Sequence, residues 1–95
     1  MARNRLTEEE LKQALSELEG WHKLDDRDAI SKSFKFKDFN AAFGFMTRAA
    51  LYAEKLDHHP EWFNVYNRVD VTLSTHSENG ITELDIRFAY FLNMR

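Results

Sequence analysis

Apolar and polar positions change their period several times along the chain, and the first period is helical. Thr7 and Glu10 have the spacing of a capping box, in which each side chain binds the other residue's main chain. Apolar residues then recur at helical intervals, at Leu11, Ala14, Leu15 and Leu18. With Gly20 as a plausible stop, this pattern predicts a helix over about 7–18.

A period of two follows and predicts a hairpin. Residues 21–24 favour a short edge strand, and the polar run at 25–28 favours a turn. Beyond it, Ile30, Phe34 and Phe36 alternate with polar residues, although Lys32 falls on the apolar face. These two segments are expected to pair.

A second hairpin and a final helix are predicted after Pro60. Residues 62–65 favour a strand, and Tyr66-Asn67 favours a turn because Asn tolerates the left-handed conformation. Residues 69–73 alternate cleanly, which places His76 on the face opposite the valines. Thr82 can cap the last helix, whose expected apolar face is Leu84, Phe88, Phe91 and Leu92.

Between the hairpins, residues 38–56 predict a helix with Asp38 as its cap and two apolar stripes. One stripe is Phe39, Phe43, Met46, Ala50 and Ala53, and the other is Ala41, Phe45, Ala49 and Tyr52. A surface helix normally needs one apolar face, so the second favours contact with another molecule over burial within its own domain. The complete pattern predicts an α+β fold in the order α-β-β-α-β-β-α, with a four-stranded antiparallel sheet and helices packed on one face.

The length, charge and amino-acid composition of the chain exclude several classes of function. The 95 residues suit one domain, 1–95, with a modest core. Thirteen Lys and Arg against 16 Asp and Glu give a net charge of −3, which argues against a broadly basic nucleic-acid binder. We expect no membrane span and no secretory signal, because no apolar run is long enough. The chain has no cysteine, which excludes thiolate chemistry. The four histidines are therefore the expected acid–base groups near neutral pH.

Candidate chemistry is densest at 54–62, which holds His58, His59 and several carboxylates where a helix ends and a strand begins. Three interpretations remain open. A metal site has suitable ligand types, but adjacent side chains diverge and helical His spacing is absent. A structural histidine could cap the helix end. In acid–base catalysis, Glu54 or Asp57 could orient an imidazole and Trp62 could wall a flat ligand.

Several motifs give the chain a resemblance to a known family. They are Asp57-His58-His59-Pro60-Glu61-Trp62, Thr72-Leu73-Ser74-Thr75-His76, Phe36-Lys37-Asp38-Phe39-Asn40 and Phe43-Gly44-Phe45-Met46-Thr47-Arg48. Together they resemble the pterin-4a-carbinolamine dehydratases over nearly the whole chain. The animal members, also called dimerisation cofactors of hepatocyte nuclear factor one, look similar, and the second animal paralogue looks the better match.

This resemblance implies dehydration of 4a-hydroxytetrahydrobiopterin to quinonoid dihydrobiopterin, with no metal and no organic cofactor. By position, the implied catalytic residues are His58, His59 and His76. The implied substrate-binding residues are Asp57, His58, His59, Ser74, Thr75, His76 and Ser77, although the animal dehydratase has Glu at the position of Ser77. Glu54, Trp62 and Asp85 are expected to tune or support the site.

The resemblance also implies a second role as a transcriptional coactivator that does not bind DNA itself. Its partner would be the dimerisation domain of hepatocyte nuclear factor one. We expect helices 38–56 from two dimers to form a homotetramer through Phe45, Ala49 and Tyr52, and the partner to use the same surface. The sequence alone does not distinguish between localisation in the cytosol, the nucleus and the mitochondrion. The resemblance to the animal proteins implies localisation in the cytoplasm and the nucleus.

Overall fold

The computed structural model describes residues 4–94 and contains one sheet and three α-helices. In chain order the elements are α1 (Glu8–Ser16), β1 (His22–Lys23), β2 (Ile30–Lys35), α2 (Phe39–Leu56), β3 (Glu61–Val65), β4 (Arg68–Leu73), the short 3-10 helix η1 (His76–Glu78) and α3 (Glu83–Asn93). The predicted α+β fold and element order are confirmed, with η1 as an addition that the sequence pattern did not predict.

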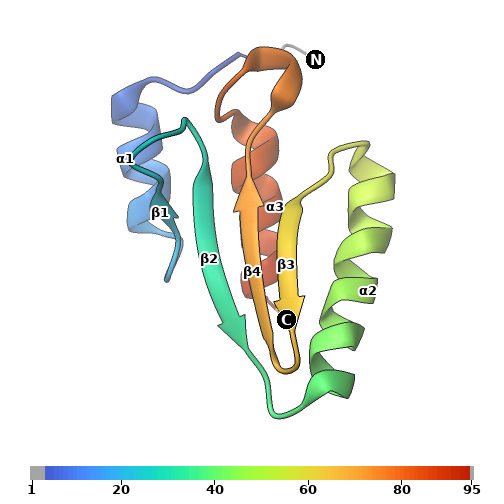
Figure 1. Ribbon diagram of the computed structural model, residues 1–95. Coiled ribbons are helices and arrows are strands. Elements are labelled where there is room, and N and C mark those ends of the chain that lie inside the picture. Colours follow the sequence, from blue (N-terminus) through green and yellow to red (C-terminus); the bar gives the residue numbers. More distant parts are fainter. Residues whose placement is uncertain (1–3, 95) are drawn as a thin grey trace.

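The sheet is antiparallel throughout, with the strand order β1-β2-β4-β3. Figure 1 shows α3 running behind the sheet, with α1 and α2 toward its two sides. Val69, Val71 and Leu73 of β4 are fully buried on the helical side. Polar residues such as Thr72 occupy the other face, which stays open because the helices cover only one side.

Each predicted N-terminal cap is present. Thr7 and Glu10 form the capping box of α1, and Asp38 accepts a hydrogen bond from the main chain of Ala41 at 2.8 Å. Thr82 and Asp85 form a second capping box at the start of α3. These caps satisfy main-chain donors that a helix leaves unpaired in its first turn, and they fix where α3 begins.

One of two turns differs from the prediction. Helix α2 ends at Leu56 as predicted, because Asp57 takes a left-handed conformation with φ 53° and its amide donates to the carbonyls of Ala53 and Glu54. At the β3–β4 turn the left-handed residue is Tyr66, with φ 48°, and not Asn67. The Asn67 side chain instead donates to the carbonyl of Phe36 at 2.9 Å, and this bond fixes the turn against the neighbouring strand's end.

The face of α2 toward the sheet also differs from the prediction. Phe45 and Ala49, which we expected in an oligomer contact, are 2% and 0% exposed. The ring of Phe45 lies 4.8 Å from Phe34 and 4.9 Å from Phe36, measured between ring centroids. Tyr52 is half-buried. Both stripes are apolar, so periodicity alone could not decide which one contacts the aromatic residues of β2 and the segment after it.

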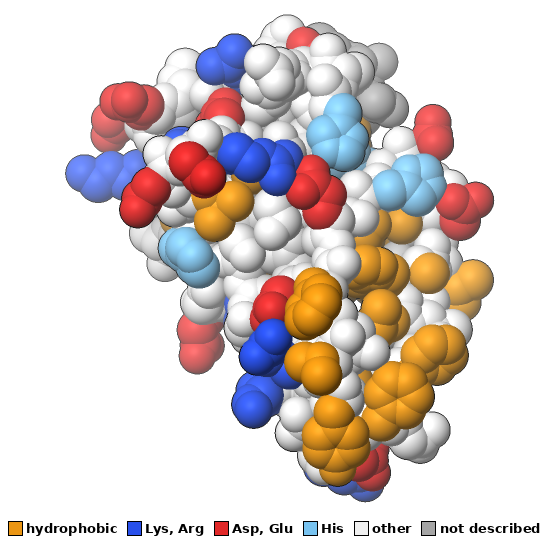
Figure 2. Space-filling view, in the orientation of Figure 1, with side chains coloured by type: hydrophobic (Ala, Val, Ile, Leu, Met, Phe, Trp, Pro, Cys, Tyr) orange, Lys and Arg blue, Asp and Glu red, His pale blue; other side chains and the backbone are white. Residues whose placement is uncertain are grey.

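The outward face of α2 remains apolar. We use the name outer stripe for its exposed residues Phe39, Phe43, Ala50 and Leu51. Phe43 is 56% exposed and Leu51 is 69% exposed. Figure 2 shows apolar side chains gathered along the side of the molecule where α2 lies. Across residues 4–94, no helix has the length and apolar character needed to cross a membrane.

Candidate active site

The left-handed turn at Asp57 places the two adjacent histidines in different surroundings. After the turn, the main-chain amide of His58 donates to the carbonyl of Ala53 at 3.0 Å. The His58 side chain is then buried against α3, whereas His59 is exposed. Their rings therefore diverge, as the sequence analysis expected for neighbouring residues, and each finds its own carboxylate.

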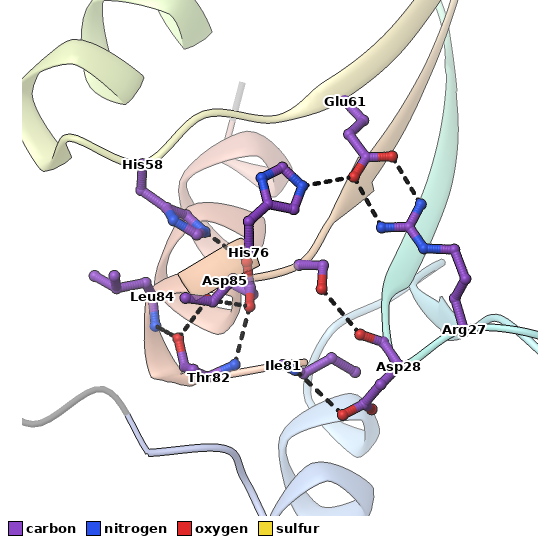
Figure 3. A network of polar contacts seen from close by, with 11 residues as sticks. Arg27, Asp28, His58, Glu61, His76, Ile81, Thr82, Leu84 and Asp85 are labelled. Atoms are coloured by element: carbon purple, nitrogen blue, oxygen red, sulfur yellow. Dashed lines mark hydrogen bonds and ion pairs between the residues drawn. The ribbon is translucent and has the colours of Figure 1, made fainter. Parts of the chain in front are cut away.

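His58 is paired with a buried carboxylate. Its Nε2 lies 2.6 Å from Oδ1 of Asp85, and the two side chains are 7% and 0% exposed. The other carboxylate oxygen, Oδ2, accepts from the Thr82 amide at 2.9 Å and from the Thr75 hydroxyl at 2.8 Å. The position of Asp85 in the first turn of α3 further favours a negative charge. Both oxygens of the Asp85 carboxylate therefore have hydrogen-bond partners (Figure 3).

His59 is paired with Glu54, which lies on the last turn of α2. The distance from Nε2 to Oε2 is 2.7 Å, and the two side chains are 55% and 78% exposed. Solvent screens this pair strongly, so it contributes little to stability. The exposed ring of His59 can exchange protons with solvent.

His76 is paired with Glu61, the first residue of β3. Its Nε2 lies 2.9 Å from Oε2 of Glu61. Both oxygens of Glu61 are also bound by the Arg27 guanidinium, each at 2.8 Å. Arg27, followed by His76, lowers the pKa of Glu61 from 4.5 to about 2. The same pairing raises the pKa of Arg27, so both groups are charged near neutral pH.

The three pairs share one geometry: each imidazole binds its carboxylate through Nε2. An ionised carboxylate only accepts hydrogen bonds, so Nε2 must carry the proton. A neutral imidazole then presents an unprotonated Nδ1 that can take a proton, and a protonated one can donate from Nδ1. Within residues 4–94, no protein partner occupies Nδ1 of His58, His59 or His76. This arrangement suits general acid–base catalysis.

The remaining expected site residues divide into supporting and accessible groups. Thr75 is 2% exposed and its hydroxyl binds Asp85, so its side chain supports the carboxylate and does not face a ligand. Ser74 donates to the carbonyl of Asp28 at 3.0 Å. Ser77 and Asp57 are exposed, and Trp62 is half-buried against the core.

Two residues that contact the site, Glu61 and Arg27, were not predicted from the sequence. Glu61 lies inside the dense segment 54–62, but strand alternation was needed to place it on the same open face as His76. Arg27 is 34 positions earlier, and only the strand order brings it to Glu61. Beside them is a polar cavity of about 570 Å³, lined by Arg5, Asp26, Arg27, Asp28, Ser74, His76 and Asn79.

The sequence and the fold of this chain are similar to those of known proteins. The profile of a family described as pterin 4 alpha carbinolamine dehydratase matches residues 4–94. Proteins named putative pterin-4-alpha-carbinolamine dehydratase from Brucella ovis and Brucella canis are each 73% identical over 93 residues, covering 98% of this chain and 96% of the relative. A crystal structure from Brucella melitensis, named transcriptional coactivator/pterin dehydratase, is 71% identical with a TM-score of 0.94, covering 96% of this chain and 97% of that one.

These comparisons correct one prediction and confirm another. The expectation of the second animal paralogue is not supported, because the chain is 73% identical to bacterial proteins over almost its whole length. The wider resemblance, based on the histidine segments, is confirmed by the match over residues 4–94. The chain therefore belongs to the pterin-4-alpha-carbinolamine dehydratase family.

Proposed function

We propose that this dehydratase converts 4a-hydroxytetrahydrobiopterin to quinonoid dihydrobiopterin through acid–base catalysis by His58, His59 and His76. The observation that carries the proposal is the set of imidazoles fixed at Nε2 by carboxylates, each with Nδ1 left for a substrate. Family membership supports the reaction class, and the geometry supports the way in which protons move.

The reaction needs two proton transfers. The bond between C4a and its hydroxyl oxygen breaks, and the oxygen leaves as water after receiving a proton from an acid. N5 loses its proton to a base as the double bond between N5 and C4a forms. Imidazole suits both steps because its ordinary pKa of about 6.5 lets it hold or release a proton near neutral pH.

The three histidines differ in their surroundings, which suggests different tasks. In the proposal, His58 and His76 are alternative acids for the hydroxyl, one for each face of the pterin ring. They are linked through the structure, since Thr75 precedes His76 and binds the same Asp85 that binds His58. His59 is more exposed than His58, and it would bind the pterin and help to move the N5 proton to solvent.

Proton transfer alone accounts for this reaction, so the proposal includes no metal and no organic cofactor. In residues 4–94, no group of three or more His, Asp or Glu side chains is placed to hold a metal ion. Main chain around Ser74 and His76, together with exposed Asp57 and Ser77, would bind the flat edge of the pterin.

Replacing each histidine in turn tests these roles. With the two C4a epimers assayed separately, we expect His58→Ala and His76→Ala each to slow one epimer by about 10²–10⁴-fold. His59→Ala should slow both. His22→Ala is the matched control, because His22 is exposed on β1 and contacts none of the three carboxylates in the described structure. Near-normal rates in all three variants would end the proposal.

We also propose a second role, assembly and partner binding through the outer stripe of α2. Phe39, Phe43 and Leu51 are each at least about half exposed, which is unusual for large apolar side chains on one helix. The Brucella melitensis relative is named a transcriptional coactivator, which supports a protein-binding role in the family. A homotetramer through paired α2 helices would cover the stripe, and a partner's helices could take its place. The bacterial relatives do not favour the dimerisation domain of hepatocyte nuclear factor one, or a nucleus, for this chain.

A charge on the outer stripe should therefore separate assembly from catalysis. We expect Phe43→Glu and Leu51→Glu to lower the native mass while leaving turnover per chain within about twofold of wild type. Lys12→Gln, on exposed α1, controls for the change of one unit in net charge. An unchanged native mass in both stripe variants would show that another surface mediates assembly.

A further inference from the structure

We infer that Glu61, held by Arg27, is a positioning residue that orients the imidazole of His76 for dehydration. The inference deepens the proposed function and rests on it. The observation behind it is that His76 is held differently from His58, although both bind a carboxylate through Nε2.

Packing cannot hold His76 in place. Its side chain is 70% exposed, whereas that of His58 is 7% exposed and lies 6.5 Å from the ring of Phe88. Among the described contacts, the bond to Glu61 is the one polar interaction of the His76 ring. An exposed imidazole can otherwise rotate between staggered conformers, so this single bond sets the direction of Nδ1.

Arg27 in turn fixes Glu61. Its planar guanidinium binds both carboxylate oxygens at 2.8 Å, a fork geometry that leaves the carboxylate little rotational freedom. Arg27 comes from the β1–β2 loop, and Glu61 begins β3 at the opposite edge of the sheet. Figure 3 shows Arg27, Glu61 and His76 in sequence across this end of the sheet.

Stability gives a weak reason for such a contact. The Arg27 and Glu61 side chains are 42% and 39% exposed, and exposed ion pairs contribute little to folding. A bidentate pair that crosses the sheet and ends on a proposed catalytic imidazole is better explained by orientation. The depressed pKa of Glu61 agrees, because the carboxylate stays ionised near neutral pH.

Several other charged groups lie near His76. Arg5, Asp26, Arg27 and Asp28 line the same cavity from the N-terminal segment and the β1–β2 loop. Glu61 faces His76 from β3, and Glu78 shares η1 with it. Of these, only Glu61 is hydrogen-bonded to the ring in the described structure.

The test is a double-mutant cycle, using the C4a epimer that depends on His76. We expect Glu61→Gln and Arg27→Met each to lower kcat by about tenfold or more with KM changed less than about threefold. In the His76→Ala background neither should lower kcat further, because both act through the missing ring. A KM near the wild-type value while kcat falls would distinguish loss of orientation from loss of substrate binding.

Asp70→Asn is the matched control, since Asp70 lies on the same open face of the sheet, pairs with Arg68 and does not contact the site. It should leave kcat and KM unchanged. A normal rate in Glu61→Gln, or a loss that persists in the His76→Ala background, overturns the inference. If His76→Ala itself turns over normally, the proposed role of His76 fails first and the positioning role falls with it. Urea midpoints for all variants identify any loss that is caused by unfolding.

Discussion

Asp85→Asn is expected to lower the turnover number for the His58-dependent epimer by about 10²–10⁴-fold while the fold is kept. The main-chain amide of Thr82 always donates, so the carbonyl oxygen of Asn must replace Oδ2. The amide nitrogen then faces Nε2 of His58 and donates to it. This puts the single proton of a neutral ring on Nδ1 and removes the anion that stabilises the imidazolium. His58 then lacks the acidic proton that the C4a hydroxyl must receive. In serine proteases a comparable exchange lowers kcat by about 10⁴.

Initial rates with each epimer and urea unfolding of the same samples measure this prediction. We expect a stability loss of about 1–3 kcal/mol, because a buried charged hydrogen-bond acceptor is replaced by a neutral one. Thr75→Ser is the control, since it keeps the hydroxyl that donates to Asp85 and should retain most of the rate. Equal slowing of both epimers, or a normal rate for both, would contradict the assignment of Asp85 to His58.

Phe45→Ala is expected to lower the free energy of unfolding by about 3–5 kcal/mol. Phe45 is 2% exposed and contacts the rings of Phe34 and Phe36, so its removal leaves a cavity between α2 and the sheet. Small domains are stable by only about 5–15 kcal/mol, so such a loss brings the chain close to unfolding at moderate temperature. Urea unfolding at low protein concentration, where assembly contributes least, measures it.

Phe43→Ala is the control for Phe45→Ala, because Phe43 lies two residues away on the outward face and is 56% exposed. At low concentration it should change the free energy of unfolding by about 0.5 kcal/mol or less. At high concentration it should lose the concentration-dependent stabilisation that an assembled wild type gains. Similar losses from both substitutions would contradict the two-faced description of α2.

Much of the fold could be predicted from local signals. Thr7, Asp38 and Thr82 each cap a helix where the sequence analysis placed a cap, because capping depends on neighbours within a few positions. The alternation at 69–73 placed Val69 and Val71 in the core for the same reason. The direction of the two apolar faces of α2 depends on distant strand residues, and here the prediction failed.

In the candidate site too, residues close in sequence could be predicted, and residues brought together by the fold could not. His58, His59 and their neighbour Glu54 lie within six positions, so a sequence pattern could group them. The family resemblance placed Asp85 near the site, but its pairing with His58 became visible only once the start of α3 was fixed. Glu61 could be grouped with His76 only once the strand pairing was known. Arg27 gave no local signal at all, since its role follows from a contact that crosses the sheet.

The most direct measurement of the central claim is the rate of water loss from synthetic 4a-hydroxytetrahydropterin with chelator-treated protein. It compares the wild type with a variant in which His58, His59 and His76 are all replaced by alanine. If histidines held at Nε2 by carboxylates perform the reaction, the wild type keeps its full rate after chelation, and the triple variant falls to the uncatalysed rate while remaining folded. A wild type silenced by chelation, or a folded triple variant with substantial turnover, would contradict the account.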